Sequence, residues 1–165
     1  MEKTTGKRTG CLSSIFSMGI FLLVGVGLSF WGWTILQNAR ASAAWPTAEG
    51  TITSSEVTRS TDAEGADSYS PEVTYTYSVN NAGYSNDTIK FGENSYSSRR
   101  KAQEIVDNYP AGKNVTVYYD PERPDRSVLE PGVSAGSYIV LGIGVFFILI
   151  TLVTIPISFF FRNRS

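Results

Sequence analysis

The sequence predicts a membrane protein in which two transmembrane α-helices flank a small α+β domain rich in β-strands. Two long stretches without a charged residue, 15–36 and 137–161, predict the membrane helices. Between them, short segments that alternate apolar and polar residues are separated by turn-forming residues, a pattern typical of antiparallel strands. We expect about five antiparallel strands, arranged as a sheet or a partly closed barrel, with one helix packed on them.

The two uncharged stretches are long enough to cross a bilayer. The first has 22 residues and the second 25, and at 1.5 Å per residue the shorter one spans about 33 Å, against a hydrocarbon core of about 30 Å. Segment 37–136 must then lie on one side of the membrane, and we place the core of its domain at about 45–131.

Basic residues set the expected orientation. The predicted tails, 1–14 and 162–165, hold five of the 14 Lys and Arg residues, and such residues favour the cytoplasmic side. We therefore expect a two-span protein of the cell membrane with both termini cytoplasmic and an extracytoplasmic domain. Cleavage of the first span as a signal peptide stays open, because residues 39–43 offer small-residue patterns, although the apolar run is longer than usual.

The predicted strands follow in order along the domain. Residues 50–59 are rich in β-branched side chains and predict a first strand, and the polar stretch 60–70 predicts a mobile loop. Segment 71–79 alternates most clearly, with Val73, Tyr75, Tyr77 and Val79 on one face. A turn at 80–83 leads to a partner strand over 84–91.

The second half of the domain predicts one helix and two strands. Residues 98–108 form the helix, with Ser97 or Ser98 as its cap and an apolar stripe formed by Ala102, Ile105, Val106 and Tyr109. Segment 114–119 is a strand with Val115, Val117 and Tyr119 on one face, and 127–130 is a short final strand.

Composition excludes several kinds of function. The chain has no histidine and one cysteine, Cys11, and its middle segment holds nine basic against 14 acidic residues. This acidic balance argues against nucleic acid. The carboxylates of 62–67 and of the turn 120–126 lack the ligand set of a calcium loop, so we expect no metal and no cofactor. Because Lys90 and Lys113 are isolated in the sequence, we expect no activated serine and no enzyme.

Residues 112–121 (GKNVTVYYDP), followed by 127–131 (SVLEP), suggest a family. Trp45 and Pro46 after the first span, the strand from Pro71 and the helix that ends in Tyr109 and Pro110 follow the same order. The chain resembles the membrane proteins catalogued as domain of unknown function 3592 over about residues 40–132. The resemblance implies a membrane-anchored, β-rich module, mostly bacterial, without an assigned activity, and it transfers no catalytic residues.

We expect the protein to act through protein contacts, as an interaction or accessory module, with the lipid bilayer and another membrane protein or a second copy as partners. The alternative is a ligand-sensing or envelope-binding module that uses a tyrosine-rich face, since eight tyrosines lie between 69 and 119. Small residues in the spans favour helix packing rather than conduction. The residues expected at an interaction surface are Tyr118, Tyr96, Arg99, Arg100, Gly25 and Gly142.

Overall fold

The structure is a computed structural model that describes residues 9–93 and 95–162, with the side chains of 19–93 and 95–154. Of the two predicted tails, residues 1–8 and 163–165 lie outside the described residues, as do the side chain of Cys11 and its surroundings. The chain divides into two compact units, a helical one (1–34 and 138–165) and a second one (35–137) that contains the domain.

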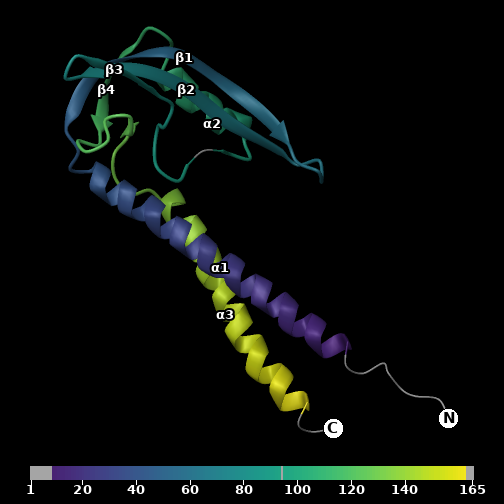
Figure 1. Cartoon of the computed structure of the whole chain (residues 1–165). Helices are drawn as coiled ribbons and strands as arrows, with labels where there is room; N and C mark the ends of the chain where they lie inside the picture. Colours follow the sequence, from purple (N-terminus) through teal and green to yellow (C-terminus); the bar gives the residue numbers. More distant parts are fainter. Residues whose placement is uncertain (1–8, 94, 163–165) are drawn as a thin grey trace, which may run out of the picture. The chain divides into compact units, whose positions relative to one another are not determined.

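The described chain contains three helices and five strands (Figure 1). In chain order they are α1 (Thr9–Ser42), β1 (Thr47–Thr61), β2 (Asp67–Val79), β3 (Ala82–Asn86), α2 (Arg99–Asn108), β4 (Asn114–Tyr119), β5 (Ser127–Val128) and α3 (Gly136–Arg162). The α+β fold class expected from the sequence is confirmed.

Two helices of the described chain are long and apolar enough to cross a membrane, in the windows Gly19–Ser42 and Gly136–Thr154. Both overlap the spans expected from the sequence. The first helix continues six residues beyond the predicted span and ends at Ser42, shortly before Pro46, which excludes the helical conformation for the residue that precedes it.

In the helical unit, α1 and α3 pack as an antiparallel pair. Gly32 lies against Leu141, whereas Gly25 lies against Gly144, so the numbering rises along one helix as it falls along the other. A Cβ atom at Gly25 would lie 3.2 Å from the carbonyl oxygen of Gly144. Glycines at these positions therefore allow the two backbones to approach closely.

The domain is built on a five-stranded antiparallel sheet in the order β3-β2-β1-β4-β5. The long hairpin of β1 and β2 forms its centre, and the paired ends of these strands extend past α2 (Figure 1). Helix α2 packs on β1 and β2 through Ala102 and Val106, which are buried. Ser98 is its N-cap residue, but the Ser98 side chain makes no capping hydrogen bond.

A β-bulge at Thr53 changes which side chains of β1 face the core. Ile52 lies opposite Tyr75, whereas Ser55, three residues later, lies opposite Val73. The extra residue therefore turns Ser55 inward, where its hydroxyl donates to the carbonyl oxygen of Val106 on α2 at 3.3 Å.

The prediction of a mobile loop over 60–70 is wrong, because most of these residues belong to the paired strands β1 and β2. Only residues 62–66 connect the strands. The Asp62 carboxylate accepts the backbone N–H groups of Glu64 and Ala66 at 3.1 and 2.7 Å, which closes a tight turn. Asp67 accepts hydrogen bonds from Arg59 at 2.7 Å and Thr61 at 2.8 Å across the strands. The polar composition of 60–70 predicted a loop, because it does not show that these side chains hydrogen-bond to one another and to the backbone.

The second hairpin has the predicted turn but a shorter partner strand. Asn80 and Asn81 both have positive φ, 52° and 65°, as a two-residue turn between antiparallel strands requires. Strand β3 ends at Asn86 rather than at residue 91. The Asn86 side-chain oxygen accepts the N–H groups of Asp87 and Thr88 at 2.7 and 3.1 Å, and this local turn takes the chain out of the sheet.

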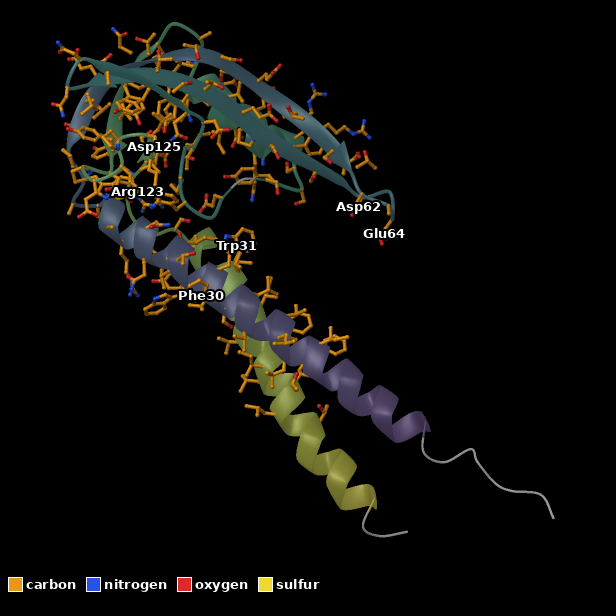
Figure 2. All side chains as sticks on the ribbon, viewed as in Figure 1. Phe30, Trp31, Asp62, Glu64, Arg123 and Asp125 are labelled. Atoms are coloured by element: carbon orange, nitrogen blue, oxygen red, sulfur yellow. The ribbon has the colours of Figure 1, made fainter. Side chains whose placement is uncertain are left out.

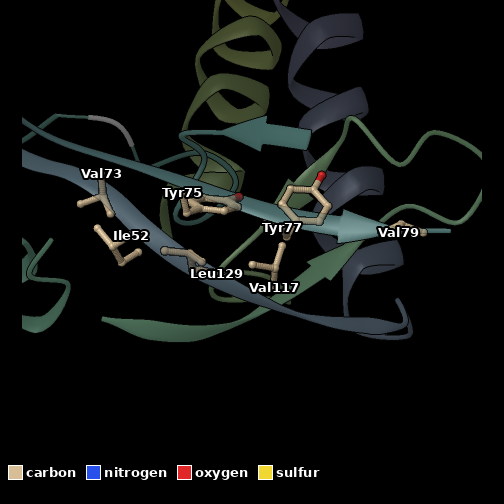
Figure 3. Close-up of a cluster of buried hydrophobic side chains, with 7 residues drawn as sticks. All are labelled: Ile52, Val73, Tyr75, Tyr77, Val79, Val117 and Leu129. Carbon is tan, nitrogen blue, oxygen red and sulfur yellow. The ribbon is translucent and has the colours of Figure 1, made fainter. Parts of the chain in front are cut away.

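The core lies on one face of the sheet (Figure 3). All four residues of the predicted β2 face are buried, which confirms the register expected for that strand. Val117 of β4 is also buried, whereas Val115 and Tyr119 are half-buried against the cluster. The buried residues of the cluster are Ile52, Val73, Tyr75, Tyr77, Val79, Val117 and Leu129.

The two edges of the sheet are joined beyond the ends of their strands. The N–H groups of Leu129 and Glu130, after β5, donate to the carbonyl oxygen of Ile89, after β3, at 3.1 and 2.8 Å. The Tyr77 hydroxyl also donates to the carbonyl oxygen of Pro124. The sheet is open in its strand pairing, and these hydrogen bonds hold its edges together.

The two ends of the domain meet. The N–H of Gly132 donates to the hydroxyl of Ser42 at 2.9 Å, and Ser42 in turn donates to the carbonyl oxygen of Ala39. Ser42 is fully buried, so this hydrogen bond joins the last residue of α1 to the segment that precedes α3.

Candidate functional site

The structure does not gather the domain residues expected at an interaction surface. Tyr118 lies opposite Thr47 at the start of β1, whereas Tyr96 bridges to Tyr69, which lies opposite Arg59 near the other end of β1. The twelve steps along the chain from Thr47 to Arg59 correspond to about 40 Å of extended strand. These tyrosines therefore belong to opposite ends of the sheet.

Arg99 and Arg100 lie together on the exposed side of α2, near Tyr96 in the sequence. Arg100 pairs with Glu104 one turn later at 3.3 Å. Both side chains are largely exposed, and such helix-surface pairs contribute about 0.3–0.5 kcal/mol.

The two glycines expected at a helix interface have different surroundings. Gly25 packs against α3 of the same chain, because an added Cβ atom would lie 3.0 Å from Ile148 and 3.2 Å from Phe147. Gly142 has nothing within 4 Å of such an atom among the described residues. Of these two glycines, therefore, Gly142 is the one whose position leaves space for a contact outside the described part of the chain.

The eight tyrosines of the domain do not form an exposed face. Tyr75 and Tyr77 are buried, and the other six are half-buried. Tyr77 also stacks against Tyr84, with ring centroids 5.7 Å apart. These rings therefore contribute mainly to the core and to cross-strand packing.

The charged segments 62–67 and 120–126 have structural roles. Asp62 and Glu64 lie at the tip of the β1–β2 hairpin, far from Arg123 and Asp125 (Figure 2). Asp120 accepts the N–H of Glu122 at 3.0 Å within its own turn. No group of three or more His, Cys, Asp or Glu side chains suited to a metal ion is found within the described residues.

A small polar cavity is the most distinctive site of the domain. It has a volume of about 240 Å³ and lies between the middle of β2, α2 and the segments that join the sheet edges. Its walls combine apolar and charged side chains, namely Pro71, Ile89, Lys90, Glu93, Tyr96, Ile105 and Glu130.

Two residues of the cavity wall, Lys90 and Glu130, belong to a hydrogen-bonded network that also includes Tyr109. The Lys90 ammonium lies 2.7 Å from one oxygen of Glu130, and the Tyr109 hydroxyl donates to the other oxygen at 3.0 Å. On another wall, the Tyr96 hydroxyl donates to Glu93 at 3.3 Å. The network connects the end of α2 to both segments that join the sheet edges.

The network changes the pKa values of its members. Burial raises the pKa of the Glu130 carboxyl, but the hydrogen bonds from Lys90 and Tyr109 and the charge of Lys90 outweigh burial, so the net shift is downward. The hydrogen bond to Glu130 raises the pKa of Lys90. Burial, followed by the hydrogen bond to Glu130, raises the pKa of Tyr109. Glu130 and Lys90 are therefore held as an ion pair.

The segment that carries Lys90 and Glu93 is held in place by contacts of Phe91 with Ser137 and Trp45. The hydroxyl of Ser137, the second residue of α3, donates to the Phe91 carbonyl oxygen at 2.9 Å. The Trp45 ring packs edge-on against the Phe91 ring, with centroids 5.9 Å apart. Gly92 follows with φ of 87°, and its backbone packs directly against Gly136 and Ser137.

Sequence reasoning missed this network. Lys90 and Glu130 are 40 positions apart. Each lies at the end of a predicted strand, and the neighbouring residues give no sign of a binding site. No motif spacing points to the pair. The closure of the sheet through Ile89 and Leu129 brings them together, and that closure is a tertiary feature.

The observations define a class of protein, one with a small α+β domain carried between two long apolar helices. The chain belongs to the family described as domain of unknown function (DUF3592), whose model matches residues 48–134. The match confirms the resemblance noted from the sequence. No curated protein matches the chain.

Proposed function

We propose that this protein crosses the cell membrane twice, holds its domain on the extracytoplasmic side and acts through protein contacts rather than by catalysis. The free edge of β1 carries this proposal. Strand β4 pairs only with residues 47–51 of β1. For residues 54–61, the described chain offers no backbone partner on the side away from β2.

This free edge is about 26 Å long, at about 3.3 Å per residue. A strand edge with unpaired N–H and C=O groups is a template for an extended segment of another chain. The edge has no proline and no lysine, residues that commonly prevent such pairing. It is also accessible, since Glu56, Thr58 and Arg59 are exposed.

The inward packing of the tyrosines favours this function over recognition by a tyrosine-rich face. The lysines also support a non-catalytic role. Lys90 is paired with Glu130, and Lys113 donates to the carbonyl oxygen of Asn108 at 2.6 Å and lies 5.5 Å from the Tyr109 ring centroid. Within the described residues, neither lysine has a serine hydroxyl as a hydrogen-bond partner.

Site-specific crosslinking in native membranes tests the interaction. A photoreactive residue at Thr58 should crosslink to a partner membrane protein or to a second copy, because this side chain belongs to the free edge. The matched control is Thr76, also an exposed threonine but on β2, which is paired on both sides by β1 and β3. Crosslinks at both positions alike, or at neither, would count against the β1 edge as the contact surface.

Thiol labelling of intact cells tests the orientation. The basic tails motivate it, together with exposed Trp31 and Trp33 near the end of the predicted span 15–36, where aromatic rings suit a membrane interface. We expect Ala63→Cys, in the exposed turn between β1 and β2, to react with an impermeant maleimide. Cys11 should react only after permeabilisation. Labelling of Cys11 with protection of position 63 would invert the topology.

A further inference from the structure

The cavity beside the Lys90–Glu130 pair has the walls of a binding site for a small molecule. Pro71, Ile89 and Ile105 form its apolar part. Lys90, Glu93, Tyr96 and Glu130 provide the polar groups. A water molecule occupies about 30 Å³ in the liquid, so a volume of about 240 Å³ suits a compact ligand rather than a drug-sized one.

Most of the hydrogen-bonding capacity that remains in this cavity belongs to acceptors, beside two N–H donors of Lys90 that its contact with Glu130 does not use. Within the described chain, the only hydrogen bond to the Glu93 carboxylate comes from Tyr96, and it uses one of the two oxygens. The Tyr96 oxygen donates its own proton in that bond and can accept another. Each oxygen of Glu130 accepts one hydrogen bond and retains a further lone pair.

The charges of the cavity favour a cation. Two carboxylates and one ammonium give its lining a net charge of −1. The side-chain hydrogen bond to Glu130 and the negative charges of Glu130 and Glu93 all raise the pKa of Lys90. Burial, followed by the charge of Glu93, raises the pKa of Tyr96. The surroundings of Lys90 therefore stabilise its positively charged form.

We propose that this cavity binds a small aliphatic primary amine in its ammonium form, with the three N–H donors directed to Glu93, Glu130 and the Tyr96 oxygen. A short hydrocarbon stem packs against Pro71, Ile89 and Ile105. The ammonium group belongs either to a free amine or to the ethanolamine headgroup of a lipid, which share this chemistry.

The site is connected to the end of α1 and the start of α3. Lys90 and Glu93 flank Phe91 and Gly92, which contact Trp45, Gly136 and Ser137. A ligand that attracts the Glu93 carboxylate acts on this same segment. Occupancy of the cavity therefore changes the environment of the Trp45 ring.

Ligand-observed NMR with butylamine tests binding directly, using the full chain in nanodiscs of lipids without amine headgroups. We expect saturable transfer of magnetisation from the protein to butylamine, and none to butanol or butyrate, which have the same stem with a neutral or negative head. Equal transfer to butanol would show that the cavity selects no charge and would overturn the proposal, as would the absence of transfer to butylamine.

Two matched variants locate the binding. Glu93→Gln removes one negative charge from the cavity and should weaken butylamine binding at least tenfold. Glu104→Gln removes the same charge from the exposed side of α2, where it pairs with Arg100 and does not line the cavity, and it should leave binding unchanged. Equal weakening by both variants would mean that the amine is attracted only by the overall acidity of the domain.

The fluorescence of Trp45 tests the connection and distinguishes the two sources. In a Trp31→Phe, Trp33→Phe background, Trp45 is the only tryptophan of the chain. Butylamine should change its emission with the same midpoint as the NMR signal. Competition that appears only when the nanodiscs contain phosphatidylethanolamine assigns the site to a lipid headgroup, and competition by free ethanolamine alone assigns it to a soluble amine. Binding that leaves the emission of Trp45 unchanged would overturn the connection.

Discussion

Tyr75→Ala is expected to lower the free energy of unfolding of the domain by about 3–5 kcal/mol, the range for truncating a buried aromatic side chain. Tyr75 is fully buried at the centre of β2. Its hydroxyl donates to the carbonyl oxygen of Thr88 at 2.9 Å and lies 3.0 Å from the Ser127 hydroxyl. The substitution leaves a void and removes a hydrogen-bonding partner from buried Ser127.

The adjacent residue provides the control. Thr76 is exposed on the opposite face of the same strand, and Thr76→Ala should change stability by less than about 0.5 kcal/mol. Tyr75→Phe keeps the ring and should lie between the two, at about 1–2 kcal/mol. Denaturant unfolding of the full chain, followed through Trp45 in the Trp31→Phe, Trp33→Phe background, measures all three. Similar losses for Tyr75→Ala and Thr76→Ala would refute the assigned faces of β2.

Gly92→Ala is expected to destabilise the domain by about 2–5 kcal/mol, from two sources. Its φ of 87° is a left-handed conformation, in which a side chain costs about 1–2 kcal/mol. A Cβ atom would also lie 2.7 Å from the backbone nitrogen of Ser137 and 2.8 Å from the carbonyl carbon of Gly136. Backbone atoms cannot rotate away as a side chain can, so overpacking adds about 1–3 kcal/mol.

Gly65→Ala isolates the conformational part of this effect. Gly65 has nearly the same φ, 84°, but an added Cβ atom there meets nothing within 4 Å among the described residues. We expect a loss of only about 1–2 kcal/mol, measured by the same unfolding experiment. Equal losses at the two positions would show that the contact of Gly92 with the start of α3 contributes nothing to stability.

Local patterns were sufficient to predict the elements of this domain whose causes are local. The alternation of 71–79 reflects one buried and one exposed face, and the pair Asn80–Asn81 adopts the positive φ values that the turn requires. The stripe on α2 was also recognisable, with Ala102 and Val106 buried. In each case the residues that determine the structure lie within a few positions of one another.

The features that the sequence did not predict depend on contacts between distant residues or on single side-chain hydrogen bonds. The bulge at Thr53 adjusts β1 to its partner strand and has no pattern of its own. The early end of β3 depends on one side-chain oxygen, that of Asn86. The Lys90–Glu130 pair needs the closure of the sheet. The residues of the candidate site could therefore not be chosen from spacing alone.

The hydrogen bond between Gly132 and Ser42 has a consequence for the modularity of the chain. The domain begins and ends at neighbouring points, as do domains that tolerate insertion into a host protein. Two antiparallel helices need only a connection of about 2–8 residues, so such a loop in place of 43–131 would complete a helical hairpin. The pair of apolar helices could then exist without the domain, whereas the domain needs Ser42 at the end of α1 and Gly136 and Ser137 at the start of α3 as packing partners.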